Sequence, residues 1–185
     1  MMHARPGTGP RRDPEADWLG WREALEAILA HCEALPTERI PAARALGCAV
    51  AEDVTAAIFH PPWDNSAMDG FAVHAADVMG ASRQNPITLP LSDDIPAGSF
   101  PSGPLEVGTV ARVMTGAPVP AGAAGVVRGE LTAETVPGAV SFFQDSDAER
   151  CIRRRGEDIV EGDSVLLRGD RVSPAAVGVL AMQGR

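Results

Sequence analysis

The stretch PPWDNSAMDGFAV, residues 61–73, places acidic, amide and hydroxyl side chains among bulky apolar ones directly after two prolines. The prolines force an extended backbone and remove two hydrogen-bond donors. The following triplet, residues 64–66, consists of residue types whose side chains hydrogen-bond to their own backbone in turns. Asp69-Gly70 predicts a second turn, because glycine can adopt positive φ. The stretch therefore predicts a rigid loop of two turns rather than regular structure.

Asp69 is expected at the tip of this loop, with Trp63, Met68 and Phe71 anchoring the loop to the core. Carboxylates on a fixed loop suit Mg²⁺, which binds through one or two of them and keeps several waters. One or two carboxylates can therefore share the ion with a substrate phosphate. The alternative is that the polar residues of the loop only cap turns, and the spacing leaves both interpretations open.

Composition narrows the range of functions. The chain has 185 residues, 45% of them hydrophobic, and a formal net charge of −9, which argues against binding to nucleic acid or to an acidic membrane surface. It contains arginine but no lysine, so this chain supplies no lysine ammonium or lysine Schiff base. The cysteines form no CxxC pair, which predicts neither a zinc site nor a disulfide framework. Without a signal-like or membrane-length apolar run, we expect a cytoplasmic protein.

Helices are predicted near both ends of the chain. Asp13-Pro14 is a typical helix start, and helical spacing of Trp18, Trp21, Leu25, Ile28, Leu29 and Cys32 predicts a helix over about 14–34. A short helix is expected in PAARAL, residues 41–46, followed by an extended segment at 48–56. Ser173-Pro174 is expected to open another helix over AAVGVLAM, residues 175–182.

The middle of the chain is rich in glycine and proline, and its apolar runs are too short for helices. Candidate strands are FAVHAA, PITLPL, TVARVM and GVVRGEL, and VPGA at 136–139 predicts a hairpin. We therefore expect an α+β fold in which a β-rich domain is inserted into a smaller mixed α/β domain. The predicted parts are a disordered tail at 1–12, a mixed helix/strand domain at 13–53 plus 146–185, and a β-rich insert at 54–145.

Two further segments carry polar groups at predicted turns. In RVMTGAPVPAGA, residues 112–123, a strand leads into Thr115-Gly116, whose hydroxyl and backbone amide could donate to an oxyanion. An ordinary β-turn is an equally good interpretation. In IRRRGEDI, residues 152–159, the arginines could grip phosphate. We favour a structural role, because Glu157 and Asp158 are close enough in sequence to pair with them.

DNSAMDGFAV, MTGAPVP and RRRGEDI occur in this order, and together they closely resemble the molybdopterin molybdenumtransferase family, which includes the C-terminal domain of gephyrin. DIPAG at 94–98 and SPAAVGVLAMQG at 173–184 fit the same family. The resemblance covers nearly the whole chain but only the front part of a family member. It implies an elongated homodimer, or a heterodimer with a full-length relative, in which each active cleft is shared between subunits.

The resemblance also implies a reaction: the insertion of molybdenum from molybdate into adenylylated molybdopterin, with Mg²⁺ and release of AMP. Asp69 matches the family's functional aspartate and Thr115 its functional threonine, which makes both candidate catalytic residues and Asp69 also the candidate metal ligand. Asn65 and Ser66 match the same loop, and with Gly116 they are the candidate substrate-binding residues. This chain would supply the dimerisation and magnesium side of the shared site.

The chain departs from the family pattern in three respects. The family usually continues MTGAPVP with an acidic pair, where this chain has Ala121 and Ala124, and Phe71 replaces a common tyrosine. The chain also ends where the family's pterin-binding α/β domain is expected to begin, so we expect the isolated chain to be inactive. Two alternatives remain open: part of a longer enzyme, or a naturally short, non-catalytic relative that acts as an interaction module for molybdenum enzymes. A weaker third is a β-rich scaffold whose loops bind a different phosphate ligand.

Overall fold

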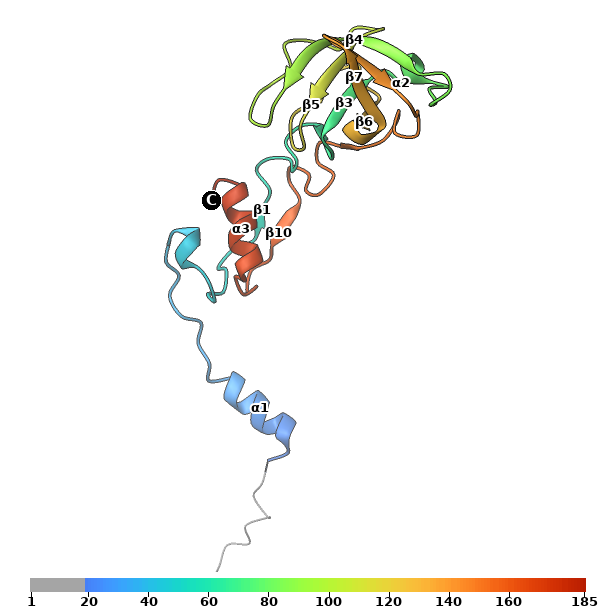
Figure 1. Cartoon of the computed structure of the whole chain (residues 1–185). Helices are drawn as coiled ribbons and strands as arrows, with labels where there is room; N and C mark the ends of the chain where they lie inside the picture. Colours follow the sequence, from blue (N-terminus) through green and yellow to red (C-terminus); the bar gives the residue numbers. More distant parts are fainter. Residues whose placement is uncertain (1–18) are drawn as a thin grey trace, which may run out of the picture. The chain divides into compact units, whose positions relative to one another are not determined.

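The computed structural model describes residues 19–185 (Figure 1). The chain divides into two units, residues 1–39 and 40–185, and each is described by itself. The predicted disordered tail at 1–12 lies outside the described residues. No helix within residues 19–185 is long and apolar enough to cross a membrane.

The first unit contains helix α1, Trp21–Leu29. The Glu23 carboxylate accepts a hydrogen bond from the Gly20 amide at 3.1 Å, which helps to start the helix at this position. The predicted helix over 14–34 is therefore too long, because residues 19–20 and 30–34 are not helical. Its predicted start at Pro14 and the side chain of Trp18 lie outside the described residues.

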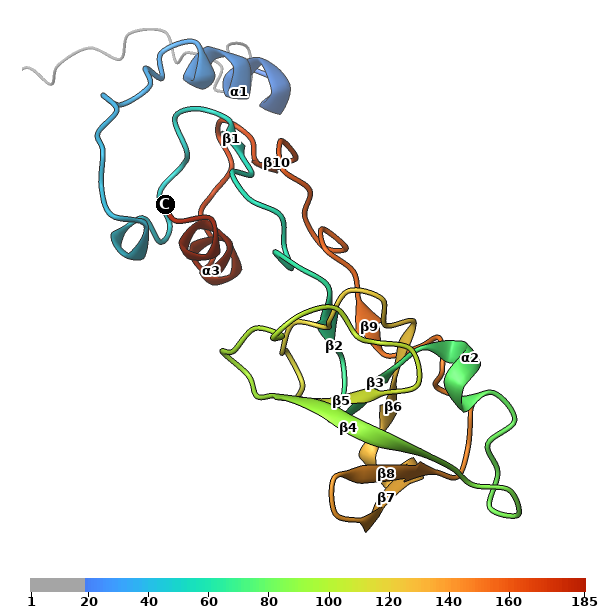
Figure 2. The same cartoon turned by 90° about the horizontal axis from the view of Figure 1, so that it is seen from above.

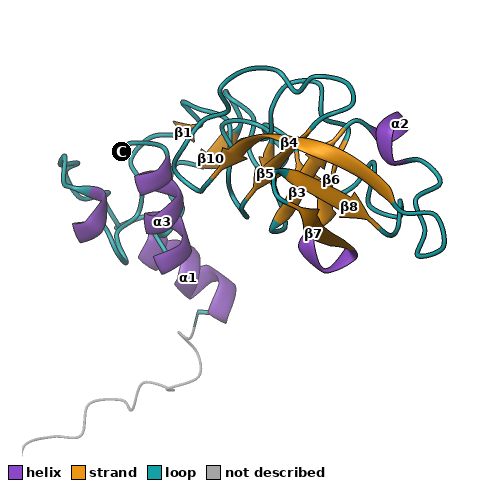
Figure 3. Ribbon diagram, turned by 45° about the horizontal axis from the view of Figure 1, so that its top comes forward, coloured by secondary structure: helices purple, strands orange, loops and turns teal. Residues whose placement is uncertain are grey.

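The second unit is dominated by a six-stranded sheet, seen from two directions in Figures 2 and 3. Strands β4 and β5 are parallel, and every other neighbouring pair in this sheet is antiparallel. In spatial order the strands are β6 (Gly125–Arg128), β3 (Gly70–Val73), β5 (Val110–Val113), β4 (Ile87–Ile95), β8 (Ala139–Phe142) and β7 (Thr132–Val136). All four candidate segments contain strands, and the hairpin around VPGA is confirmed. The strand in FAVHAA ends at Val73, however, because residues 75–76 are helical, and GVVRGEL ends in a 3₁₀ turn, η2 (Gly129–Leu131).

The central strands are buried on both faces. Side chains alternate across a strand, so Phe71 and Val73 of β3 join one apolar cluster while Ala72 joins another. Val127 and Val126 of β6 divide in the same way. This two-sided burial explains why these strands are continuous apolar runs in the sequence instead of alternating apolar and polar residues. The same burial fixes the register between β3 and β5, and therefore the positions of their ends.

Short elements outside this sheet form a third apolar cluster. Helix α3 (Pro174–Met182) packs with the 3₁₀ turn η1 (Ala42–Arg44) and with β1 (Val54–Thr55), which pairs with β10 (Ser164–Leu166). Ser173 Oγ accepts a hydrogen bond from the Ala176 amide at 3.1 Å, so the predicted start of α3 is confirmed. Of the predicted extended segment at 48–56, only β1 and a bridge at Ala49 are formed.

The structure places strand pairs between distant parts of the sequence. Strand β2 (Asn65–Ser66) pairs with β9 (Ile152–Arg153), and β1 pairs with β10. The remaining helix, α2 (Ala75–Val78), follows β3 directly. The α+β character is confirmed, while the insertion of one domain into another and the domain boundaries stay predictions.

Candidate functional site

Asp69 and Thr115, the two residues predicted to be catalytic, are in direct contact. Asp69 Oδ1 accepts a hydrogen bond from the Thr115 amide at 2.7 Å and another from the Thr115 hydroxyl at 2.6 Å. Among the described residues, none donates a hydrogen bond to Asp69 Oδ2. The pair therefore fixes one carboxylate oxygen and leaves the other available to a ligand.

The sheet topology brings these two residues together. Strand β3 begins at Gly70, immediately after Asp69, and antiparallel β5 ends at Val113, two residues before Thr115. Gly70 and Val113 are partners in the register of these strands. Asp69 and Thr115 consequently lie at the same end of these two strands, in neighbouring turns.

The Asp69 carboxylate is exposed and acidic. Hydrogen bonds from the Thr115 hydroxyl and then from the Thr115 amide lower the pKa of Asp69, because both stabilise the charged form, while a small desolvation effect opposes them. The carboxylate is therefore ionised at neutral pH. A side chain turned into the core and surrounded by amides would exclude a ligand role, and Asp69 does not have that arrangement.

Asn65 and Ser66 are the buried polar residues of the loop. They are 8% and 1% exposed, and they form β2. Ser66 Oγ donates to the Met68 carbonyl at 2.5 Å and accepts from the Met68 amide at 3.3 Å, which stabilises the bend before Asp69. Their predicted role in binding substrate stays a prediction, and the contacts favour positioning of the loop.

Gly116 corrects one detail of the prediction. Its amide was expected to be free to donate to an oxyanion, but it donates to the Ser66 carbonyl at 2.8 Å. Both donors of Thr115 are also engaged by Asp69. In this structure the turn therefore holds the carboxylate in place, and the Gly116 amide is not an available oxyanion donor.

The reason for a glycine at position 70 also differs from the prediction. It does not adopt positive φ, because it already belongs to β3. A Cβ at this position would lie 2.1 Å from the Val127 carbonyl oxygen. Glycine is needed here because β6 approaches the backbone closely, and not because of a turn conformation.

The anchoring residues of the loop behave differently from one another. Phe71 is buried in the sheet core, as predicted. Trp63 is 40% exposed and packs edge-to-face against Phe100, with ring centroids 4.9 Å apart. The expectation that Trp63 anchors the loop to the core is therefore wrong.

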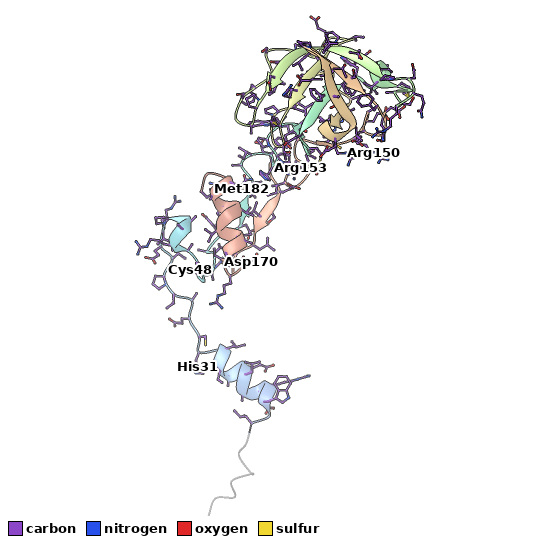
Figure 4. All side chains as sticks on the ribbon, in the orientation of Figure 1. His31, Cys48, Arg150, Arg153, Asp170 and Met182 are labelled. Atoms are coloured by element: carbon purple, nitrogen blue, oxygen red, sulfur yellow. The ribbon has the colours of Figure 1, made fainter. Side chains whose placement is uncertain are left out.

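The arginines of RRRGEDI make structural contacts. Arg153, labelled in Figure 4, donates to Asp158 at 2.5 Å and lies 3.6 Å from Glu157. Arg155 stacks over the Phe59 ring, 3.9 Å from its centroid. The preferred structural role is confirmed for Arg153, whose two acidic partners are the predicted ones.

Asp64 is the polar residue whose contacts the sequence did not reveal. Its carboxylate accepts hydrogen bonds from the Arg154 guanidinium at 2.6 Å and from the Arg155 amide at 2.8 Å. The partner segment lies 90 residues further along the chain. Asp64 was expected to cap its own turn, and only a three-dimensional arrangement reveals that it joins two segments.

The chain offers only a small part of a metal site. Within residues 19–185 no three His, Cys, Asp or Glu side chains form a group that could hold a metal ion. Asp69 is exposed and ionised, and its Oδ2 has no hydrogen-bond donor among residues 19–185, which fits a single carboxylate ligand to Mg²⁺. Mg²⁺ keeps most of its shell as water or substrate oxygens, so one carboxylate is consistent with a shared site.

The chain is similar in sequence to the proteins of one family. Residues 19–184 match the family model of the MoeA N-terminal region (domain I and II). The chain is 44% identical over 145 residues to molybdopterin molybdenumtransferase 2 of Mycobacterium tuberculosis, covering 78% of this chain and 36% of the relative. It is 37% identical over 171 residues to molybdopterin molybdenumtransferase of Synechococcus elongatus, covering 90% of this chain and 42% of the relative.

A solved structure shows the same fold. The crystal structure of molybdopterin biosynthesis moeA protein from Pyrococcus horikoshii OT3 matches with a TM-score of 0.81 at 31% identity. The match covers 88% of this chain and 43% of that protein. The chain thus spans less than half the length of each of these three relatives.

Proposed function

The chain belongs to the family of the MoeA N-terminal region, and from this premise we propose that it serves in molybdenum cofactor biosynthesis as part of a molybdopterin molybdenumtransferase. The reaction in this proposal inserts molybdenum from molybdate into adenylylated molybdopterin and releases AMP. The names of the two relatives support the reaction class. Because the chain matches only 36% and 42% of their lengths, the complete activity is itself part of the proposal.

One observation carries the proposal: Asp69 presents an ionised oxygen to solvent while Thr115 fixes the other. Two unit charges 4 Å apart interact by about 1 kcal/mol in water and by about 4 kcal/mol near a protein surface. Asp69 alone would therefore repel a molybdate dianion or a pterin phosphate. The carboxylate becomes useful only where a cation lies between it and the anionic substrate.

The residues have distinct roles in this proposal. Thr115 orients Asp69 through its amide and hydroxyl, and Ser66 and Gly116 hold the two turns together. Asp69 Oδ2 is the ligand offered to Mg²⁺. When bound, Mg²⁺ would supply charge neutralisation at the substrate oxygens. A single carboxylate and one hydroxyl cannot enclose a dianion, so the proposal assigns the rest of the site to a further protein surface, shared in a dimer.

The test is an assay of the gene product that carries these 185 residues. It is incubated with molybdate, adenylylated molybdopterin and Mg²⁺, and AMP is measured by chromatography. We expect AMP release to require all three, with molybdenum appearing in the pterin in equal amount. A folded protein that releases no AMP, or that releases it equally without molybdate, would overturn the proposal. The alternative of a non-catalytic interaction module predicts no AMP release, and no contact described above favours it.

A further inference from the structure

Asp64 connects the loop that carries Asp69 to the arginine segment. Its Oδ2 accepts from Arg154 Nη1 at 2.6 Å, and its Oδ1 accepts from the Arg155 amide at 2.8 Å. Both carboxylate oxygens are thus used, in contrast to Asp69. This pairing of a side chain with a guanidinium and a backbone amide fixes the position of the carboxylate in two directions.

The same residue also connects to the segment that carries Thr115. The Asp64 carbonyl accepts from the Val119 amide at 3.0 Å, and the Ser66 carbonyl accepts from the Gly116 amide at 2.8 Å. Strand β2 therefore lies between two segments: β9 and the following arginines on one side, and the turn after β5 on the other. Asp64 is the point at which all three segments meet.

The electrostatics show that Asp64 is held in its charged form. Partial burial favours the neutral form, but the bond from the Arg155 amide and the interaction with the Arg154 guanidinium outweigh it and lower the pKa of Asp64. Arg154 is exposed and Asp64 is half-buried, and ion pairs of this exposure contribute little to global stability. The link between Asp64 and Arg154 is therefore better suited to fixing local geometry than to stabilising the fold.

We propose that Asp64 is a positioning residue for the Asp69–Thr115 site, acting through its link to Arg154 and Arg155. The proposal rests on the proposed function, because it assigns Asp64 to the same reaction. Asp64 does not touch the ligand in this scheme. It keeps β2 in register with the turn at Thr115, so that Asp69 accepts both Thr115 bonds before a cation arrives.

The test uses two single variants, Asp64→Asn and Arg154→Met, and their combination, in the gene product that carries this chain. Asparagine can still accept from the Arg155 amide but loses the charge, and Arg154→Met leaves that amide bond in place. Removing a group that orients a ligand typically costs 10- to 100-fold in activity or metal affinity, so we expect kcat to fall by about 10-fold in each variant with KM nearly unchanged. The combined variant should lose no more than either single one, because both remove the same link.

A spectroscopic readout separates positioning from general destabilisation. The amide proton of Thr115 bonds to a charged carboxylate, so its NMR chemical shift reports the Asp69 contact without depending on turnover. We expect this resonance to shift in both variants at a temperature where the sheet amides are unchanged. Asp93→Asn is the matched control: its carboxylate also accepts two backbone amides, from Ser102 and Asp94, but contacts neither loop. It should change neither kcat nor the Thr115 resonance.

The outcomes distinguish the two proposals. If Asp69 variants lose activity while Asp64→Asn and Arg154→Met keep full kcat and an unchanged Thr115 resonance, the positioning role is refuted and the proposed function stands. Additive losses in the combined variant would also refute it. If the unaltered protein inserts no molybdenum, the proposed function fails, and the Thr115 resonance alone still decides whether Asp64 positions the pair.

Discussion

Replacing Asp69 by asparagine is expected to lower the rate of molybdenum insertion by about 100-fold, equivalent to about 2.7 kcal/mol of lost transition-state stabilisation. Asparagine keeps the size of the side chain and can still accept the Thr115 hydrogen bonds through its carbonyl oxygen. It removes the negative charge and replaces the second carboxylate oxygen by an amide NH₂, which cannot bind a cation. The effect is therefore on the ligand and not on the loop. The measurement is AMP release under saturating molybdate and pterin nucleotide.

Folding should be unaffected in this variant, because Asp69 is exposed and joins no apolar cluster. Thermal unfolding of the Asp69→Asn protein should match that of the unaltered protein. Asp163→Asn is the control, since its carboxylate also accepts a backbone amide, that of Val160 at 2.8 Å, in a turn remote in sequence from the site. Full activity in a folded Asp69→Asn protein would contradict the assigned role.

Replacing Gly70 by alanine is expected to destabilise the second unit by about 3 kcal/mol or more, which would unfold a domain of marginal stability. The added Cβ would lie 2.1 Å from the Val127 carbonyl oxygen and 2.9 Å from its carbon. These are backbone atoms of β6, so no side-chain rotation can relieve the clash. Strands β3 and β6 must separate, and the register of Gly70 with Arg128 is lost.

Urea denaturation followed by circular dichroism measures this change in the free energy of unfolding. Gly103→Ala is the matched control, because no atom lies within 4 Å of a Cβ there and its φ is not positive. It should unfold at the same urea concentration as the unaltered chain. A Gly70→Ala protein of equal stability would show that β3 and β6 are not packed as described.

The loops of the site were predictable from local chemistry, whereas their pairing was not. Two prolines, a run of turn-forming residues and an acidic residue before glycine mark the first loop, and Thr115-Gly116 between a strand and Pro118 marks the second. The bond between Asp69 and Thr115 joins residues 46 apart. It depends on β3 and β5 being antiparallel neighbours, which is a property of the sheet order and leaves no local signal in either segment.

Errors in the prediction came from interactions of the same long-range kind. Gly70 was expected to serve a turn, but the reason for glycine there is the approach of β6. Asp64 was expected to cap its own turn, but its partners are 90 and 91 residues away. The helix over 14–34 was extended beyond Trp21–Leu29 because apolar spacing persists past the helical residues. Elements whose limits depend on local residues, such as the start of α3 at Ser173, were predicted well.

The role assigned to Asp69 requires it to bind a cation, and paramagnetic relaxation by Mn²⁺, a common substitute for Mg²⁺, tests this directly in the gene product that carries this chain. Adding Mn²⁺ should broaden the NMR resonances of the Thr115 and Gly70 amides first, and added Mg²⁺ should reverse the broadening. In Asp69→Asn these resonances should stay sharp at the same Mn²⁺ concentration. Equal broadening in both proteins, or broadening confined to other acidic residues, would contradict the account.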